Sequence, residues 1–324
     1  MPLKDVAKRL LADCMGLAAN EKTLIVVDDK SREIGQTMYV AAEELGAAPL
    51  LLLMPPTGVS GREPPELVAY AMRRSDVVMC PTTYSLTHTK ARIDAAAAGA
   101  RIATMPGITE AMFEKGAITA DYTEVEALTL KITALLDKAE TATIKKGGHT
   151  LSLSLAGRKG VPSTGVYRKP GQSGNLPSGE AYIAPVENSS SGSMVIDGSM
   201  VGIGTLEAPL VVHLDDGRLT KIDGDHAGKL DVLFAQPENG ILCELGIGTN
   251  RAAILCGIIL EDEKVYGTVH IAFGTNTSFG GTNKAGCHMD GVILKPTLLL
   301  DGAPVLVDGE FVRDGSVLFK GRDS

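Results

Sequence analysis

The pattern of apolar residues changes near residue 146, and this change constrains the fold more than any other feature of the sequence. Before it, apolar runs such as residues 23–28 alternate with amphipathic stretches such as residues 64–74. This alternation is typical of a parallel sheet flanked by helices. After it, short apolar runs are separated by Asp-Gly and Asn-Gly pairs, which favour hairpin turns. The sequence therefore predicts an α/β domain over residues 1–146 and a mainly antiparallel β (α+β) domain over residues 147–324.

Most strands and helices of the first domain can be predicted individually. Short apolar runs predict strands, and longer stretches with a period near 3.6 residues predict helices. The expected strands cover residues 23–28, 48–54, 76–80 and 101–105, and the expected helices cover residues 64–74, 87–98 and 122–138. In the second domain one helix is expected near residues 223–235, because Asp225 can cap its first turn.

The length and charge of the chain restrict its class of partner. A chain of 324 residues exceeds what one hydrophobic core usually serves, so two domains are expected. The net charge of −8 argues against nucleic acid or an anionic membrane as the main partner. No apolar run could span a bilayer, the first residues lack the core of a signal peptide, and the five cysteines are scattered. We therefore expect a cytoplasmic protein that acts on a small molecule or a short peptide.

Two histidines and an aspartate lie close together in the second domain. His270 ends a β-type run, and His288 and Asp290 follow a glycine-rich loop that can return the chain as a hairpin. In His-x-Asp both side chains point to the same face of a strand, because side-chain direction repeats every two residues. Imidazole and carboxylate groups are common ligands of divalent metals. The pattern predicts a metal site formed by these three residues in the β-rich domain.

Two glutamates in apolar surroundings are candidates for further ligands. Glu180 opens a β-type run after Asn-Leu-Pro-Ser-Gly, and Glu244 is surrounded by apolar residues in Ile-Leu-Cys-Glu-Leu. A carboxylate buried in such a run is costly unless it is paired or bound to a cation. We therefore expect both glutamates to serve the metal site as ligands or as acid/base groups.

These motifs occur in an order that resembles a known family. Asn-Leu-Pro-x-Gly-Glu-x-Tyr-x-Ala-Pro, then Gly-Thr-Val-His-Ile-Ala-Phe-Gly, then His-x-Asp is similar to the aminopeptidase T, or thermophilic metalloprotease, family of leucyl-type aminopeptidases. The resemblance spans roughly residues 172–310, and a sister group with the same fold contains 2,5-dihydroxypyridine dioxygenases. It implies that Glu180 and, less closely, Glu244 match the family's two glutamates. It likewise implies that His270, His288 and Asp290 match its histidines and aspartate, and that the chain forms a homodimer.

The resemblance leaves two reactions open. With a pair of divalent metals such as Zn, Co or Mn, the site would release N-terminal residues from peptides through a metal-activated water. With a single Fe(II) held by His270, His288 and Asp290, it would cleave a hydroxylated aromatic ring with O₂. The presence of both glutamates favours hydrolysis, whereas the absence of the family's tyrosine after His270 favours ring cleavage. On these grounds the sequence favours hydrolysis, with ring cleavage as the alternative.

Other histidines give weaker signals for a site. His213 precedes Asp215 in a second His-x-Asp, but the following Asp-Gly predicts a hairpin tip, where aspartate serves the turn. His88 falls in a loop of the α/β domain, and His149 follows Lys-Lys-Gly-Gly, which is typical of a linker. We expect none of the three to bind metal.

Overall fold

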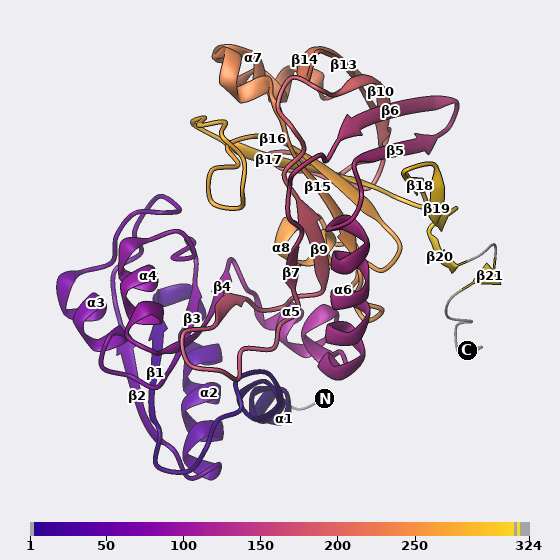
Figure 1. Cartoon of the computed structure of the whole chain (residues 1–324). Coiled ribbons are helices and arrows are strands. Elements are labelled where there is room, and N and C mark those ends of the chain that lie inside the picture. Colours follow the sequence, from indigo (N-terminus) through magenta and orange to yellow (C-terminus); the bar gives the residue numbers. More distant parts are fainter. Residues whose placement is uncertain (1–2, 314–315, 318–324) are drawn as a thin grey trace. The chain divides into compact units, whose positions relative to one another are not determined.

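The computed structural model describes residues 3–313 and 316–317, which form two compact units (Figure 1). The first unit comprises residues 1–126 together with residues 163–178. The second comprises residues 127–162 and 179–324. Each unit contains its own sheet or sheets. The residue ranges show that the chain leaves the first unit, returns to it once, and then completes the second.

The first unit is built on a five-stranded sheet in which every pair of neighbouring strands is parallel. The central strands are almost wholly apolar because helices cover parallel sheets on both faces. The strands, in spatial order, are β2 (Ala48–Leu53), β1 (Lys22–Val27), β3 (Val77–Thr82), β4 (Arg101–Pro106) and β8 (Ser173–Asn175).

Helices connect the strands of this sheet. Thr89 and Thr109 begin two of them as N-caps, because each side-chain oxygen accepts a hydrogen bond from the backbone N–H three residues later. The helices are α1 (Leu3–Arg9), which continues as a π-helical turn over Leu10–Cys14, α2 (Arg32–Glu44), α3 (Glu66–Met72), α4 (Lys90–Ala97) and α5 (Glu110–Glu114). Helix α6 (Tyr122–Leu136) then leads into the second unit.

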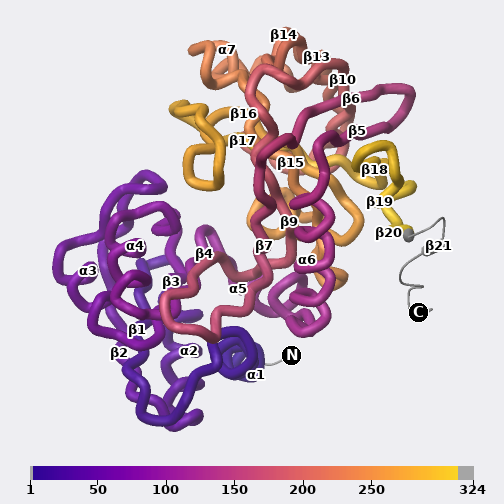
Figure 2. The backbone as a smooth tube through the Cα atoms, viewed as in Figure 1, coloured from indigo at the N-terminus to yellow at the C-terminus, as the bar shows by residue number. Residues whose placement is uncertain are grey.

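The second unit contains a nine-stranded, largely antiparallel sheet. Strand β5 pairs with β18, as Figure 2 shows by the contrast of magenta and yellow, although more than 150 residues separate them in the sequence. In spatial order the strands are β14 (Arg218–Asp223), β13 (Leu210–Asp215), β10 (Ser191–Ile196), β6 (His149–Ser154), β5 (Thr141–Lys146), β18 (Thr297–Leu300), β19 (Ala303–Val307), β20 (Glu310–Arg313) and β21 (Ser316–Val317).

A seven-stranded sheet completes the second unit and carries the residues of functional interest. Its strands, in spatial order, are β12 (Gly204–Thr205), β11 (Ser199–Met200), β17 (His288–Ile293), β16 (Val269–Gly274), β15 (Leu242–Gly248), β9 (Glu180–Ile183) and β7 (Val161–Ser163). Buried side chains from both sheets and from α6 form one hydrophobic core. Because strand residues alternate between faces, the seven-stranded sheet has one face in this core and another that is free for other chemistry.

The prediction of a helix-flanked parallel sheet followed by a mainly antiparallel β domain is confirmed. The helix expected near residues 223–235 is divided into a 3₁₀ turn at Ala227–Leu230 and the short α7 (Val232–Ala235), and Asp225 caps neither. The described residues also form the short α8 (Ile259–Asp262) and 3₁₀ turns at Asp29–Ser31, Ala117–Thr119 and Pro237–Gly240. No helix in the described part of the chain is long and apolar enough to cross a membrane.

The division between the units differs from the boundary expected after Lys146. Residues 141–154 form the hairpin of β5 and β6, and that boundary falls at its turn. Gly147 and Gly148 have positive φ values of 55° and 81°, which a tight turn between paired strands requires. A Lys-Lys-Gly-Gly stretch therefore serves as a hairpin turn here, although the same composition is typical of a linker.

Candidate metal centre

All five residues predicted for the site lie on one face of the seven-stranded sheet. Glu180 is on β9, Glu244 on β15, His270 on β16, and His288 and Asp290 are on β17. Figure 1 shows β15, β16 and β17 side by side, as their pairing requires. The residues that alternate with them along each strand point to the opposite face, where the hydrophobic core lies. The period of two predicted for His-x-Asp therefore holds across four neighbouring strands.

Small residues stand between the site residues and provide the room that the imidazoles need. Gly246 pairs with His270, and a Cβ atom added at Gly246 would lie 1.9 Å from His270 Nε2. Ala272 stands between Glu244 and Asp290 in register, and Gly274 pairs with His288. Larger side chains at these positions would fill the space where the polar groups meet.

The ligating atoms lie at distances suited to a common cation. His270 Nε2 is 3.4 Å from a carboxylate oxygen of Glu180 and 3.4 Å from one of Glu244. His288 Nε2 is 3.2 Å from the second oxygen of Glu244 and 3.4 Å from Asp290 Oδ1. Two ligands bound at about 2.1 Å on adjacent corners around a metal are themselves about 3.0–3.5 Å apart.

Several buried atoms of these residues have no hydrogen-bond partner within the described part of the chain. They are Glu180 Oε2, Asp290 Oδ1 and both ring nitrogens of His270. The three residues are at most 6% exposed, so they are nearly shielded from bulk solvent. An unsatisfied buried carboxylate oxygen or imidazole costs about 1–3 kcal/mol or more. Glu244, His270 and Asp290 can each direct one ligating atom to the same small region. The donor set therefore fits a divalent metal.

His288 is oriented by a contact on the far side of its ring. Its Nδ1 lies 2.9 Å from the carbonyl oxygen of Thr275, so an Nδ1–H donates there and leaves Nε2 to face the carboxylates. Metal-binding histidines are commonly fixed in this way by a carbonyl acceptor. The His288 side chain is 30% exposed, whereas that of His270 is fully buried. His288 therefore marks the open side of the centre.

An aromatic pair adjoins this open side. The ring of Phe279 meets that of His288 edge to face at 6.0 Å between centroids, and meets Tyr182 at 5.3 Å. Tyr182 pairs with Gly246 across β9 and β15, so it stands on the same face of the sheet as the metal ligands. The site thus combines charged donors with a wall of flat rings.

Two further charged residues belong to the site, and the sequence did not reveal them. Lys264 is completely buried; its Nζ donates to Glu180 Oε1 at 2.7 Å and also contacts the Glu263 carboxylate. Both residues follow α8 in the stretch Glu-Asp-Glu-Lys, which has the composition of an exposed charged segment. Only the short separation of six residues from His270 could have drawn attention to Lys264.

Burial and neighbouring charges shift the pKa values of the site residues. Burial opposes protonation of His270, but the neighbouring carboxylates of Glu244 and Glu180 raise its pKa to about 9. Burial, reinforced by the charge of Glu180, raises the pKa of Glu263 to about 8. Without a cation the imidazoles hold protons among the carboxylates, and a divalent metal must displace them. Metal affinity should therefore fall as the pH falls.

A carboxylate outside the centre organises the glycine-rich loop between β16 and β17. Glu187 accepts hydrogen bonds from the Thr282 backbone N–H at 2.7 Å and from Asn276 Nδ2 at 2.9 Å, and it contacts Arg158. Asn283 donates to the carbonyl oxygen of Gly274. These hydrogen bonds hold the loop against the end of β16.

The other histidines have contacts consistent with structural roles. His213 pairs at 2.9 Å with Asp223, not with Asp215, and both partners are well exposed. His149 opens β6, and its Nδ1 is 2.8 Å from Ser193 Oγ. His88 lies in the first unit, whereas the metal-centre residues lie in the second.

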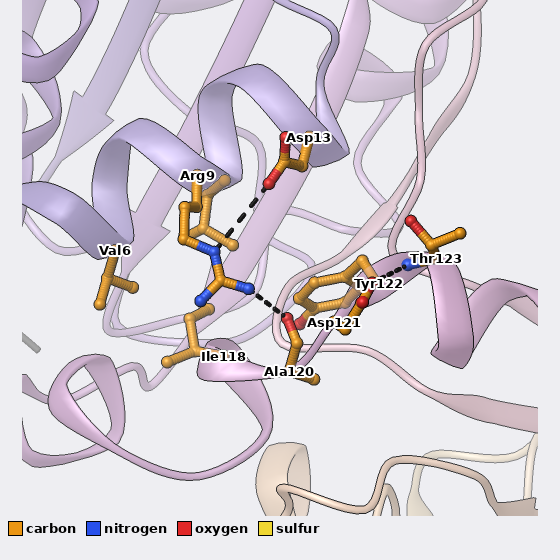
Figure 3. A pocket seen from close by; sticks show the side chains of 9 residues that line it. Val6, Arg9, Asp13, Ile118, Ala120, Asp121, Tyr122 and Thr123 are labelled. Carbon is orange, nitrogen blue, oxygen red and sulfur yellow. Dashed lines mark hydrogen bonds and ion pairs between the residues drawn. The ribbon is translucent and has the colours of Figure 1, made fainter.

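The first unit contains a hollow of its own, shown in Figure 3. Arg9 lies in it, 4.0 Å from Asp13 and 3.0 Å from the carbonyl oxygen of Ala120. Asp121 accepts a hydrogen bond from the backbone N–H of Thr123. Each charged group labelled there thus has a partner.

Comparison with known proteins identifies the family. The model of the family described as 2,5-dihydroxypyridine 5,6-dioxygenase matches residues 3–313. The chain belongs to this family. A 2,5-dihydroxypyridine 5,6-dioxygenase of Pseudomonas putida is 25% identical over 200 residues. This match spans 55% of the present chain and 56% of the relative, little more than half of each.

Two solved structures share the fold. The structure of 2,5-dihydroxypyridine dioxygenase from Pseudomonas putida KT2440 aligns with a TM-score of 0.81 at 20% identity, covering 97% of this chain and 98% of the other. Wild-type AmpT from Thermus thermophilus aligns with a TM-score of 0.70 at 15% identity, covering 96% and 99%. The predicted family, spanning aminopeptidase T and the dioxygenases, is confirmed. The prediction of an enzyme is supported, but the comparisons favour the dioxygenase alternative over hydrolysis.

Proposed function

We propose that this chain is a dioxygenase that uses a single Fe(II) to open a dihydroxylated pyridine ring, with 2,5-dihydroxypyridine as the first substrate to test. The observation that carries the proposal is that His270 and Asp290 can direct ligating atoms to one small region and that His288 Nε2 lies 3.4 Å from Asp290 Oδ1. The dioxygenase family model matches this chain over residues 3–313. Two histidines and one carboxylate with open positions are the ligand set of non-haem Fe(II) oxygenases.

In this proposal His270, His288 and Asp290 hold the metal. Bound Fe(II) would supply the redox chemistry through which O₂ reacts with an aromatic ring. Glu244 lies 3.4 Å from one imidazole and 3.2 Å from the other, so it holds both rings toward the same point. The small residues opposite the histidines keep this region free for the substrate.

Glu180 has the position of an acid/base group. Lys264 Nζ donates to Glu180 Oε1 at 2.7 Å and thereby fixes the position of the carboxyl group. Glu180 Oε2 is buried, has no hydrogen-bond partner and lies 3.4 Å from His270 Nε2. We infer that Oε2 accepts the proton of a ring hydroxyl, since a general base must lie within hydrogen-bond reach of that proton.

The aromatic wall supports a flat substrate. Tyr182 and Phe279 meet edge to face beside the partly exposed His288, and aromatic rings favour stacked or edge-to-face contacts with other rings. A dihydroxypyridine would present its ring to this wall and its hydroxyl groups to the charged donors. Peptide substrates gain less from such a wall.

Metal-assisted hydrolysis is the second candidate. It is favoured by the two glutamates, which both lie beside His270, and by the fold shared with AmpT. A hydrolase of this kind needs two cations, and the identity and number of metals therefore separate the two proposals. The homodimer and the cytoplasmic location expected from the sequence stay predictions.

The test is a pair of assays on one preparation. The protein is purified without oxygen, loaded with Fe(II), and mixed with 2,5-dihydroxypyridine while O₂ consumption and ring absorbance are followed. In parallel, aliquots loaded with Zn(II), Co(II) or Mn(II) are given Leu-p-nitroanilide. We expect one mole of O₂ to be consumed for each mole of 2,5-dihydroxypyridine lost, as measured by its absorbance, and no release of p-nitroaniline.

Metal-free protein and the His213→Ala variant serve as controls. The variant loses an exposed histidine outside the centre and should keep full activity, whereas metal-free protein should have none. Rapid release of p-nitroaniline without any O₂ consumption would replace the dioxygenase proposal by the hydrolase.

A further inference from the structure

Two groups of possible metal ligands overlap at His270. One consists of Glu244, His270 and Asp290, and the other of Glu180, Glu263 and His270. Two-metal centres hold two neighbouring cations, and here each group could hold one of them, with His270 bound to only one of the two. The two groups differ in one respect, because a lysine side chain contacts the carboxylates of the second group.

That side chain is Lys264. Its Nζ is bonded to Glu180 at 2.7 Å and contacts Glu263, so it touches both carboxylates of the second group. The side chain is 0% exposed, whereas those of Glu180 and Glu263 are 8% and 15% exposed. A buried ammonium group is stable only with such partners. A divalent cation binding the same carboxylates would meet this positive charge at close range.

We propose that the ammonium group of Lys264 occupies the place of a second cation and thereby limits the centre to one divalent metal. The proposal rests on the proposed function, because it explains how a fold shared with AmpT is restricted to a single metal. The lysine supplies one positive charge and no redox or Lewis-acid chemistry. The remaining group, with Glu244, His270 and Asp290, stays open to the metal.

The backbone fixes Lys264 in this place. Its N–H donates to the carbonyl oxygen of Glu261 at 3.0 Å, and its own carbonyl accepts from the Asn250 N–H at 2.9 Å. The next residue approaches β15 so closely that a Cβ at Gly248 would lie 1.9 Å from the carbonyl oxygen of Val265. Since the segment is anchored against the sheet, Lys264 cannot withdraw without disrupting it.

Glu180 gains a defined role from this arrangement. Lys264 engages Oε1, and only Oε2 remains directed to His270. A glutamate that bridged two metals through both of its oxygens would need Oε1 free of the lysine. The lysine therefore converts a potential bridging ligand into a carboxylate with one free oxygen, as acid/base chemistry requires.

Metal stoichiometry tests the proposal directly. Wild type, Lys264→Ala and Lys284→Ala are dialysed against saturating Mn(II), and bound metal per chain is measured by elemental analysis. Lys284 is an exposed lysine of the glycine-rich loop, so its variant controls for the loss of one positive charge. We expect one metal in wild type and in Lys284→Ala, and two in Lys264→Ala. The double variant Lys264→Ala, Glu263→Gln should return to one.

Two metals in wild type, or one in folded Lys264→Ala, would overturn the proposal. Should Lys264→Ala fail to fold, electron paramagnetic resonance of Mn(II)-loaded wild type decides. An isolated six-line signal supports the single site, and an exchange-coupled pair overturns it. The outcome is independent of the reaction, because one bound metal without O₂ consumption would remove the proposed function and leave this inference intact.

Discussion

Both units carry a cluster of buried polar side chains at a sheet, but only one cluster is satisfied internally. In the first unit, Asp28 follows β1 and accepts from the Thr83 N–H at 2.6 Å and from the Thr83 hydroxyl at 3.0 Å. Two strands away, on β4, Thr104 Oγ1 donates to Asn175 at 2.7 Å and lies 2.8 Å from Thr87 Oγ1. These groups bond to one another and hold loops in place.

The cluster of the second unit has the opposite character. Glu180, His270 and Asp290 are as deeply buried, yet each keeps at least one ligating atom without a hydrogen-bond partner. Burying such atoms lowers the stability of the fold unless another interaction, such as metal binding, compensates. The comparison teaches that burial of polar residues is not itself a sign of function, whereas convergent unsatisfied ligands are.

The largest effect should come from removing a ligand of the unsatisfied cluster. His288→Ala should lower metal affinity by more than about 100-fold. Loss of a residue that only orients a metal ligand costs up to about that much. The fold should persist, because His288 is partly exposed and its strand keeps its neighbours. Elemental analysis and circular dichroism measure the two effects. Full metal occupancy in this variant would contradict the assignment.

Filling the space of the centre should have the next largest effect. Gly246→Ala places a methyl group where His270 Nε2 now lies, 1.9 Å from the new carbon, so the imidazole must move. We expect metal affinity to fall by about 10- to 100-fold, as for loss of ligand orientation. Gly228→Ala, which has no atom within 4 Å of its added carbon and does not have a positive φ, is the control for a glycine substitution and should leave affinity unchanged.

A matching change in the satisfied cluster should act on stability alone. Asp28→Ala leaves the Thr83 N–H without its acceptor and should lower the free energy of unfolding by about 1–3 kcal/mol. Metal content should not change. Urea denaturation and elemental analysis test both statements, and metal loss in the folded variant would show that the two clusters are not separate in function.

The smallest effect should appear at the loop near the site. Burial alone would raise the pKa of Glu187, but hydrogen bonds from the Thr282 N–H and from Asn276, with the charge of Arg158, lower it to about 2. Because the folded pKa is below the usual 4.5, the ionised group stabilises the protein above that value. This contribution is lost as the pH falls toward 2.

Glu187→Gln should therefore cost about 1 kcal/mol at neutral pH and much less in acid. Thermal unfolding of both proteins between neutral and acidic pH measures the difference. If the difference in unfolding temperature between wild type and Glu187→Gln stays constant over this pH range, the charge of Glu187 does not stabilise the loop.

The sequence was sufficient for the elements whose pattern is local. The strand expected at residues 48–54 is β2, and that expected at residues 101–105 is β4. The helix expected at residues 87–98 is α4, shortened because the Thr89 side chain caps its first turn. Strand periodicity also placed His288 and Asp290 on one face, as β17 has them.

Long-range pairing accounts for what the sequence could not supply. Strand β8 lies beside β4 in the first unit, although a composition shift suggested that the first domain had already ended. Lys264 reaches Glu180 across 84 residues, and no local pattern distinguishes it from a surface lysine. Glu180, Glu244 and His270 could be named individually, but only the pairing of β9, β15 and β16 brings them together.

Anomalous diffraction is the most direct test of the central claim that the unsatisfied cluster holds one divalent metal. Crystals of the protein loaded anaerobically with Fe(II) would be measured on both sides of the iron absorption edge. The account predicts one strong peak per chain, in contact with His270, His288 and Asp290 and separate from Lys264. No peak there, or a second peak between Glu180 and Glu263, would contradict it.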